Sequence, residues 1–139
     1  MSLPVLDDRV FLGAVTVNGN LQVLGQLLAA IEPEEINDPG DGGAIPVQSS
    51  GTLLLESGAS GETRTLAIPT FVGQRMAIGF DTDGGGDIVI TVAQPVNQTG
   101  NNTLTGADAG DFIVLEAITS SGAYIWRVVA NDGFGLTTV

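Results

Sequence analysis

The stretch at residues 74–94 constrains the fold most, because two short apolar runs flank a loop built from Asp, Thr and Gly. In the second run, 88–92, Ile and Val alternate between the two faces of an extended strand. The glycines at 84–86 supply the positive backbone dihedrals that a chain reversal requires. The stretch therefore predicts a β-hairpin between residues 76–80 and 88–92.

Residues 111–130 predict a second hairpin, because two further apolar runs are joined by Thr-Ser-Ser-Gly. In its second strand Tyr124 and Trp126 share one face, and we favour a place in the core for both over an aromatic platform for a sugar. Glu116 is expected to face outward or to pair with Arg127 of the neighbouring strand.

The rest of the C-terminal part repeats short apolar runs with turn signals between them. The further runs that we interpret as strands are 45–47, 51–57, 62–68 and 102–105, and residues 136–139 form a tail or a last short strand. Twenty glycines and few aromatic residues fit a chain of short strands and tight turns. We predict an all-β fold, an antiparallel β-sandwich or barrel of jelly-roll type with an extended N-terminal β arm, because a parallel sheet needs crossover helices.

Composition divides the chain into three parts. Residues 1–31 form an N-terminal arm, and residues 45–139 form the β domain. Between them, residues 32–44 hold five acidic residues, two prolines and three glycines. Such a composition is typical of a solvated linker rather than of a packed core.

The arm carries alternating apolar pairs between glycines at 13, 19 and 25. A single hairpin at Asn18-Gly19 and a short fibrous β repeat, as in intertwined trimeric shafts, both fit this pattern. The arm is too short to form a core alone, so we expect copies of the chain to bury it in a homotrimer. The predicted interface residues are Val15, Val17, Leu21, Val23, Leu27 and Leu28.

Charge excludes two classes of partner. Sixteen carboxylates face only four arginines and no lysine, which gives a net charge of −12. Nucleic acid and anionic membrane surfaces both attract basic proteins, so neither is an expected partner.

The residue types that most enzymes use are also missing. The chain has no cysteine and no histidine, which excludes thiol nucleophiles, thiolate metal sites and the usual general base. We expect no enzyme activity and no cofactor. A small carboxylate enzyme remains an alternative only if Glu56, Glu62 and Glu116 converge in a cleft.

Asp81, Asp83 and Asp87 are the one metal candidate, because DTDGGGD superficially resembles the start of a calcium-binding EF-hand loop. The flanking helices and the terminal glutamate of that motif are missing, so we favour Asp side chains that cap their own turn. Asn97 and Asn101 each begin a glycosylation sequon. The N-terminus shows no signal peptide, so we expect synthesis in the cytoplasm and treat both sequons as chance matches.

The run from Gly51 to Gly133 resembles a recurring β domain of tailed-phage virion proteins. The resemblance lies in GTLLLES at 51–57, T-L-x-I-P-T-F-x-G-Q at 65–74, GDFIVLEAI at 110–118 and W-R-V-V ending in N-D-G at 126–133. Within these proteins the chain looks like the small capsid decoration (cement) and head-fibre class. The motifs are structural, and no functional residue of the class is carried over.

This resemblance implies a structural virion protein that is made in the host cytoplasm and sits on the capsid surface. It also implies a homotrimer, with the major capsid protein as its partner. The alternative is a tail-fibre or receptor-binding module whose loops, 81–87 and 95–111, contact a host glycan.

Overall fold

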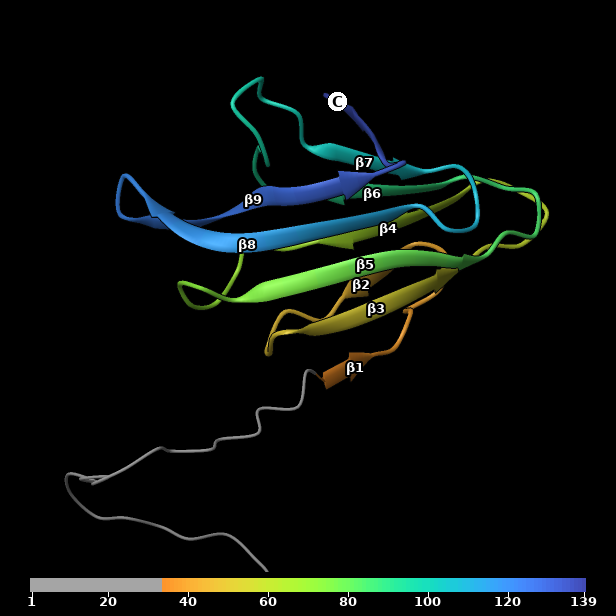
Figure 1. The fold of residues 1–139 in the computed structure, drawn as a ribbon, viewed down its shortest axis with the longest axis horizontal. Helices are drawn as coiled ribbons and strands as arrows, with labels where there is room; N and C mark the ends of the chain where they lie inside the picture. The colour runs from red at the N-terminus through yellow and green to blue at the C-terminus, as the bar shows by residue number, and fades with distance from the viewer. Residues whose placement is uncertain (1–33) are drawn as a thin grey trace, which may run out of the picture. The chain divides into compact units, whose positions relative to one another are not determined.

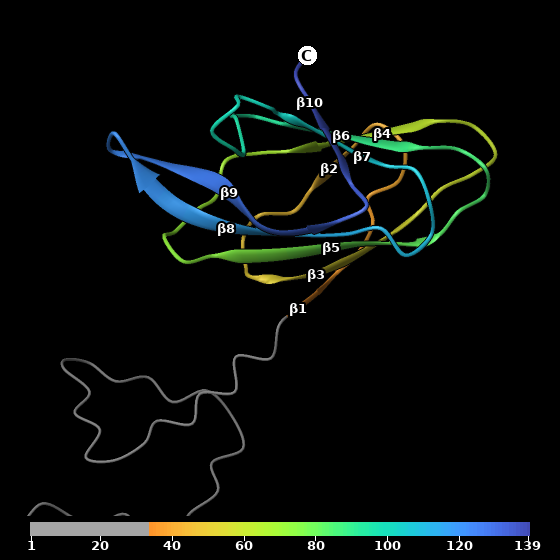
Figure 2. The ribbon, with the colours of Figure 1, turned by 45° about the horizontal axis from the view of Figure 1, so that its top comes forward.

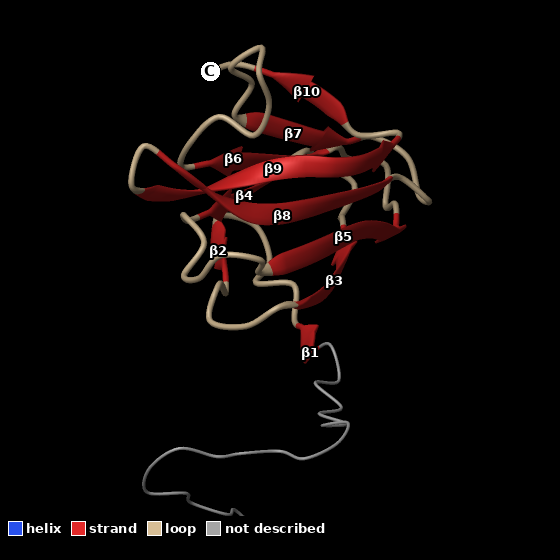
Figure 3. Ribbon diagram, turned by 60° about the vertical axis from the view of Figure 1, so that its left-hand side comes forward, coloured by secondary structure: helices blue, strands red, loops and turns tan. Residues whose placement is uncertain are grey.

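The computed structural model describes residues 34–139, which form ten strands in two five-stranded sheets packed face to face (Figures 1 and 2). Sheet A contains, in spatial order, β1 (Glu34–Ile36), β3 (Gly51–Glu56), β5 (Arg75–Thr82), β8 (Phe112–Ser120) and β9 (Ala123–Asp132). Sheet B contains β10 (Gly135–Thr137), β7 (Thr103–Gly106), β6 (Ile88–Val92), β4 (Glu62–Leu66) and β2 (Gly43–Ile45). The predicted all-β sandwich is confirmed, and within the described part only strands and loops occur (Figure 3).

The chain alternates between the two sheets over its first six strands. As a result β1, β3 and β5 pair in parallel in sheet A, and β2, β4 and β6 pair in parallel in sheet B. Only the last four strands add antiparallel pairs. The prediction of antiparallel, jelly-roll pairing is therefore wrong, and both sheets are mixed. A strand in the opposite sheet makes the crossover that we had expected a helix to make.

The predicted hairpin at residues 74–94 is also wrong. β5 pairs with β3 and β8 in sheet A, whereas β6 pairs with β4 and β7 in sheet B. The loop at 83–87 is thus an arch that carries the chain from one sheet to the other. An arch and a hairpin share one sequence signature, because both join two half-buried strands through a glycine-rich loop.

The second predicted hairpin is confirmed. β8 and β9 pair antiparallel up to Ser120 and Ala123, leaving Ser121 and Gly122 as a two-residue turn. Both turn residues have positive φ, 49° and 81° respectively, as a type I′ turn requires.

The core lies between the sheets and is built from alternate strand residues. Leu53, Ile78, Ile90, Leu104 and Leu115 are completely buried, and side chains of both sheets contribute. Burial of such aliphatic side chains supplies most of the favourable free energy of folding.

Residues 34–45 belong to this sandwich. Ile36 of β1 and Ile45 of β2 are buried, and both strands pair in register with the next strand of their sheet. The acidic, glycine-rich composition of residues 32–44 predicts a linker, and that prediction is wrong for residues 34–44. The predicted arm, with Val15, Val17, Leu21, Val23, Leu27 and Leu28, lies outside the described residues.

Candidate functional site

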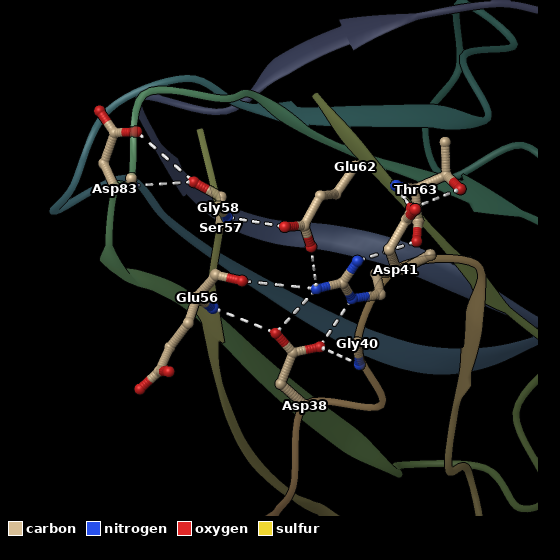
Figure 4. A network of polar contacts seen from close by, with 11 residues as sticks. Asp38, Gly40, Asp41, Glu56, Ser57, Gly58, Glu62, Thr63 and Asp83 are labelled. Carbon is tan, nitrogen blue, oxygen red and sulfur yellow. Dashed lines mark hydrogen bonds and ion pairs between the residues drawn. The ribbon is translucent and has the colours of Figure 1, made fainter. Parts of the chain in front are cut away.

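A buried arginine lies at the centre of the densest polar network in residues 34–139 (Figure 4). Arg64 is inward-facing on β4, like Leu66, and its side chain is only 1% exposed. Its Nε donates to Asp38 Oδ1 at 2.6 Å, and its Nη2 donates to Asp38 Oδ2 at 3.0 Å and to Glu62 Oε2 at 2.8 Å. Because a buried charge is very costly without partners, these two carboxylates are what allow Arg64 to lie there.

This Arg64 clamp, which we define as Asp38, Glu62 and Arg64, joins two successive arches. Asp38 belongs to the arch between β1 and β2, and it also accepts hydrogen bonds from the backbone N–H groups of Gly40 and Glu56, both at 3.1 Å. Glu62 accepts from the N–H of Gly58 at 2.7 Å, in the arch between β3 and β4. The clamp therefore ties neighbouring turns of the chain together at one end of the sandwich.

The pKa values of the clamp follow from these contacts. Partial burial acts to raise the pKa of Asp38, but hydrogen bonds from Arg64 and from the backbone outweigh it and hold that pKa below its ordinary value. The N–H of Gly58 and then Arg64 lower the pKa of Glu62. The hydrogen bond to Asp38 raises the pKa of Arg64 against the opposing effect of burial. All three groups are thus held in their charged forms, which suits an ion pair and not proton transfer.

At the other end of the sandwich, a buried amide side chain also links two connections by hydrogen bonds. Gln74 is fully buried, and its Nε2 donates to the carbonyl oxygens of Val47 and Ser49, both at 2.8 Å. Its Oε1 accepts from the N–H of Thr70 at 2.8 Å. Gln74 thereby joins the β2–β3 and β4–β5 connections. It ends the T-L-x-I-P-T-F-x-G-Q motif, and sequence reasoning gave it no role.

Of the three calcium candidates, Asp83 holds its own loop and the other two lie on the surface. Asp83 Oδ1 accepts from the N–H of Gly85 at 2.7 Å and lies 3.5 Å from Ser57 Oγ, so Asp83 caps its own turn as we favoured. Asp81 and Asp87 are exposed. Among residues 34–139, no three His, Cys, Asp or Glu side chains lie close enough together to hold a metal ion.

The remaining predicted residues are divided between core and surface. Trp126 is buried and donates from Nε1 to the carbonyl of Ala67 at 2.8 Å, as expected for a core residue, whereas Tyr124 is exposed near the hairpin turn. Core burial of the pair is therefore right for Trp126 and wrong for Tyr124.

Both sequon asparagines hold the β6–β7 loop. Asn97 Oδ1 accepts from the N–H groups of Gly100 and Asn101, and its Nδ2 donates to Asn101 Oδ1 at 2.8 Å. Their side-chain amides thus serve the loop itself.

The three carboxylates of the enzyme alternative have separate roles. Glu62 belongs to the Arg64 clamp, and Glu56 lies exposed at the end of β3. Glu116 is opposite Arg127 in the ladder as predicted, but its side chain pairs with Arg75 on the other side, with Nε and Oε2 3.6 Å apart. Arg127 instead donates to the carbonyl of Pro95 at 3.3 Å.

The outer face of sheet A exposes apolar side chains. In its central row Leu54, Gly79 and Phe112 are aligned across β3, β5 and β8, and the row ends at Asp132 of β9. Leu54 is 47% exposed and Phe112 is 39% exposed. A second row, parallel to the first, begins at Glu35 of β1 and continues with the small or apolar residues Thr52, Ala77, Val114 and Ala130. Such a face is typical of a surface that packs against protein.

The outer face of sheet B has a different character. One row crosses all five strands and consists of Ala44, Thr65, Thr91, Thr103 and Thr137, of which Thr103 is buried. This row carries no charge, and cross-strand threonine pairs stabilise a sheet.

Comparison with known proteins gives no assignment. No family model matches the chain, and no curated protein matches it significantly. In the described residues, no helix has the length and apolar character needed to cross a membrane.

Proposed function

We propose that this protein is a structural virion protein that decorates and stabilises the capsid of a tailed phage as a homotrimer. The observation that carries the proposal is the outer face of sheet A, where an apolar centre lies exposed on a strongly acidic chain. A surface of this kind is built to pack against another protein surface. The resemblance of residues 51–133 to phage decoration and head-fibre proteins is the reason that we assign this surface to a phage capsid.

The internal construction of the sandwich supports a role in a durable particle. Buried polar side chains fix successive connections at both ends, through Arg64 at one end and Gln74 at the other. In the described part, the buried polar clusters around Arg64 and Gln74 serve these structural contacts. What remains for function is surface, and we assign that surface to the major capsid protein and to other copies of the chain.

Immunogold labelling of virions whose genome encodes this chain tests the location. We expect gold particles over the head surface, and we expect the protein to remain with heads after tails have been removed. Label confined to the tail tip, together with binding on a glycan array, would overturn the proposal in favour of the receptor-binding alternative.

A further inference from the structure

The outer face of sheet A is charged at its two ends, and the charges have opposite signs. Arg75, Glu116 and Arg127 form a row across β5, β8 and β9. Arg75 is 59% exposed. The third arginine of the described residues, Arg64, is buried in its clamp. Both cations that residues 34–139 offer to a partner therefore lie in this one row.

The other end of the same face is acidic. Glu35, Glu56 and Asp81 line a shallow groove beside Leu54. Within the described residues these three carboxylates form no ion pair. Asp132 follows on β9, opposite Phe112. On a chain with a net charge of −12, unpaired carboxylates repel each other and gain from an incoming cation.

The apolar centre lies between these two ends. A Cβ added to Gly79 would lie 3.2 Å from Leu54 Cδ2 and 3.5 Å from Phe112 Cδ2, so both side chains lean over the glycine. Along the direction of the strands the face thus runs from the basic row, through the two middle rows, to Glu56 and Asp81. Glu35 and Asp132 lie at the edges of the two middle rows, on β1 and β9.

We propose that copies of this chain associate through the outer face of sheet A, with the Arg75 and Arg127 end of one copy against the acidic end of the next. A second copy is the occupant that fits, because it carries both the cations and the carboxylates that the face needs. Each copy uses its basic end for one neighbour and its acidic end for the next, so the contact is head to tail and closes into a ring when the rotation allows. The inference rests on the self-association in the proposed function and names its surface.

Charge reversal on the full chain tests this contact. The variant R75E/E116R/R127E inverts the basic row and keeps an oppositely charged pair at positions 75 and 116. The variant E56R/D81R inverts the acidic end. The control T65E/T91E changes the net charge by the same amount as the first variant, on exposed positions of sheet B. Far-ultraviolet circular dichroism and melting temperature confirm that each variant is folded.

Sedimentation equilibrium at low salt gives the dissociation constant of each protein. We expect each reversed end to weaken association at least about tenfold, because like charges then face each other across the contact. Combining all five reversals in one chain should restore association to within a few-fold of the original, and the control should not change it. We also expect association of the unmodified chain to weaken as salt is added.

Two results would overturn the inference, and they differ in what else they affect. If the unmodified chain forms a trimer and neither reversed end weakens it, the contact lies elsewhere and the proposed homotrimer stands. If the unmodified chain is a monomer at every concentration, the proposed homotrimer and this contact fail together.

Discussion

At the scale of single residues, two buried polar side chains hold connections that lie far apart in the sequence. Arg64 reaches the arch between β1 and β2, and Gln74 reaches the connection between β2 and β3. Arg64 and Leu66 alternate with Thr63 and Thr65, so they share one face of β4, and that face is the core. No local pattern names Asp38 as its partner, because the contact exists only once β2 and β4 lie side by side.

Removing Asp38 should leave the Arg64 guanidinium buried with one carboxylate partner. We expect D38A to lower the free energy of unfolding by about 2–4 kcal/mol, since breaking a buried ion pair strands the remaining charge. Urea denaturation measures the change. The matched control D87A alters an exposed carboxylate and should stay within about 0.5 kcal/mol. Equal effects of the two substitutions would contradict the clamp.

The clamp should also make stability depend on acid. The folded-state pKa values of Asp38 and Glu62 lie below their ordinary values of 3.8 and 4.5. A carboxylate with a lowered pKa stabilises fully above its unfolded-state pKa, and this contribution is lost as the pH falls through the folded-state value. We therefore expect the free energy of unfolding to fall below about pH 4.5, and to fall less steeply in D38N. Parallel pH profiles for the two proteins would argue against this assignment.

At the scale of elements, the sequence revealed the strands but not their partners. Eight of the predicted strands match strands within a few residues, from β2 to β9, and β10 falls in the run predicted as a tail or a last short strand. The alternation of apolar residues reports that one face of a strand is buried, and it is silent on which sheet receives the strand. The predicted pairing of residues 76–80 with 88–92 is therefore wrong. β1 was not predicted, because the residues around it are acidic.

The glycines of the β5–β6 loop distinguish an arch between the sheets from a hairpin within one sheet. A hairpin turn uses such glycines for positive φ, but of the three only Gly85 has one, at 106°. A Cβ on Gly86 would overlap the backbone of Ser60 in the neighbouring arch. We expect G86A to cost about 2–3 kcal/mol, and G85A, which has open space, to cost about 1 kcal/mol. Thermal or urea denaturation measures both, and a harmless G86A would contradict the stacked arches.

At the scale of the whole molecule, the chain combines a sandwich fixed from within and an outer face that remains available to a partner. The predicted interface residues of the arm fall outside the described part, while of the metal candidates Asp83 caps its own turn and Asp81 and Asp87 are exposed. The distribution of charge on sheet A was not visible in the sequence, because Glu56, Asp81 and Arg127 come to lie on one face only through the strand order. For the whole molecule, the central proposal is therefore that copies of the chain associate with each other.

Solution mass by multi-angle light scattering tests that claim most directly, on the full chain and on a chain that starts at Glu32 and so keeps β1 and Asp38. We predict that the full chain has three times its mass of 14.2 kDa, about 43 kDa. A trimeric shortened chain would place the contact in the sandwich, and a monomeric one would place it in residues 1–31. A full chain that stays at 14.2 kDa at every concentration would contradict the homotrimer.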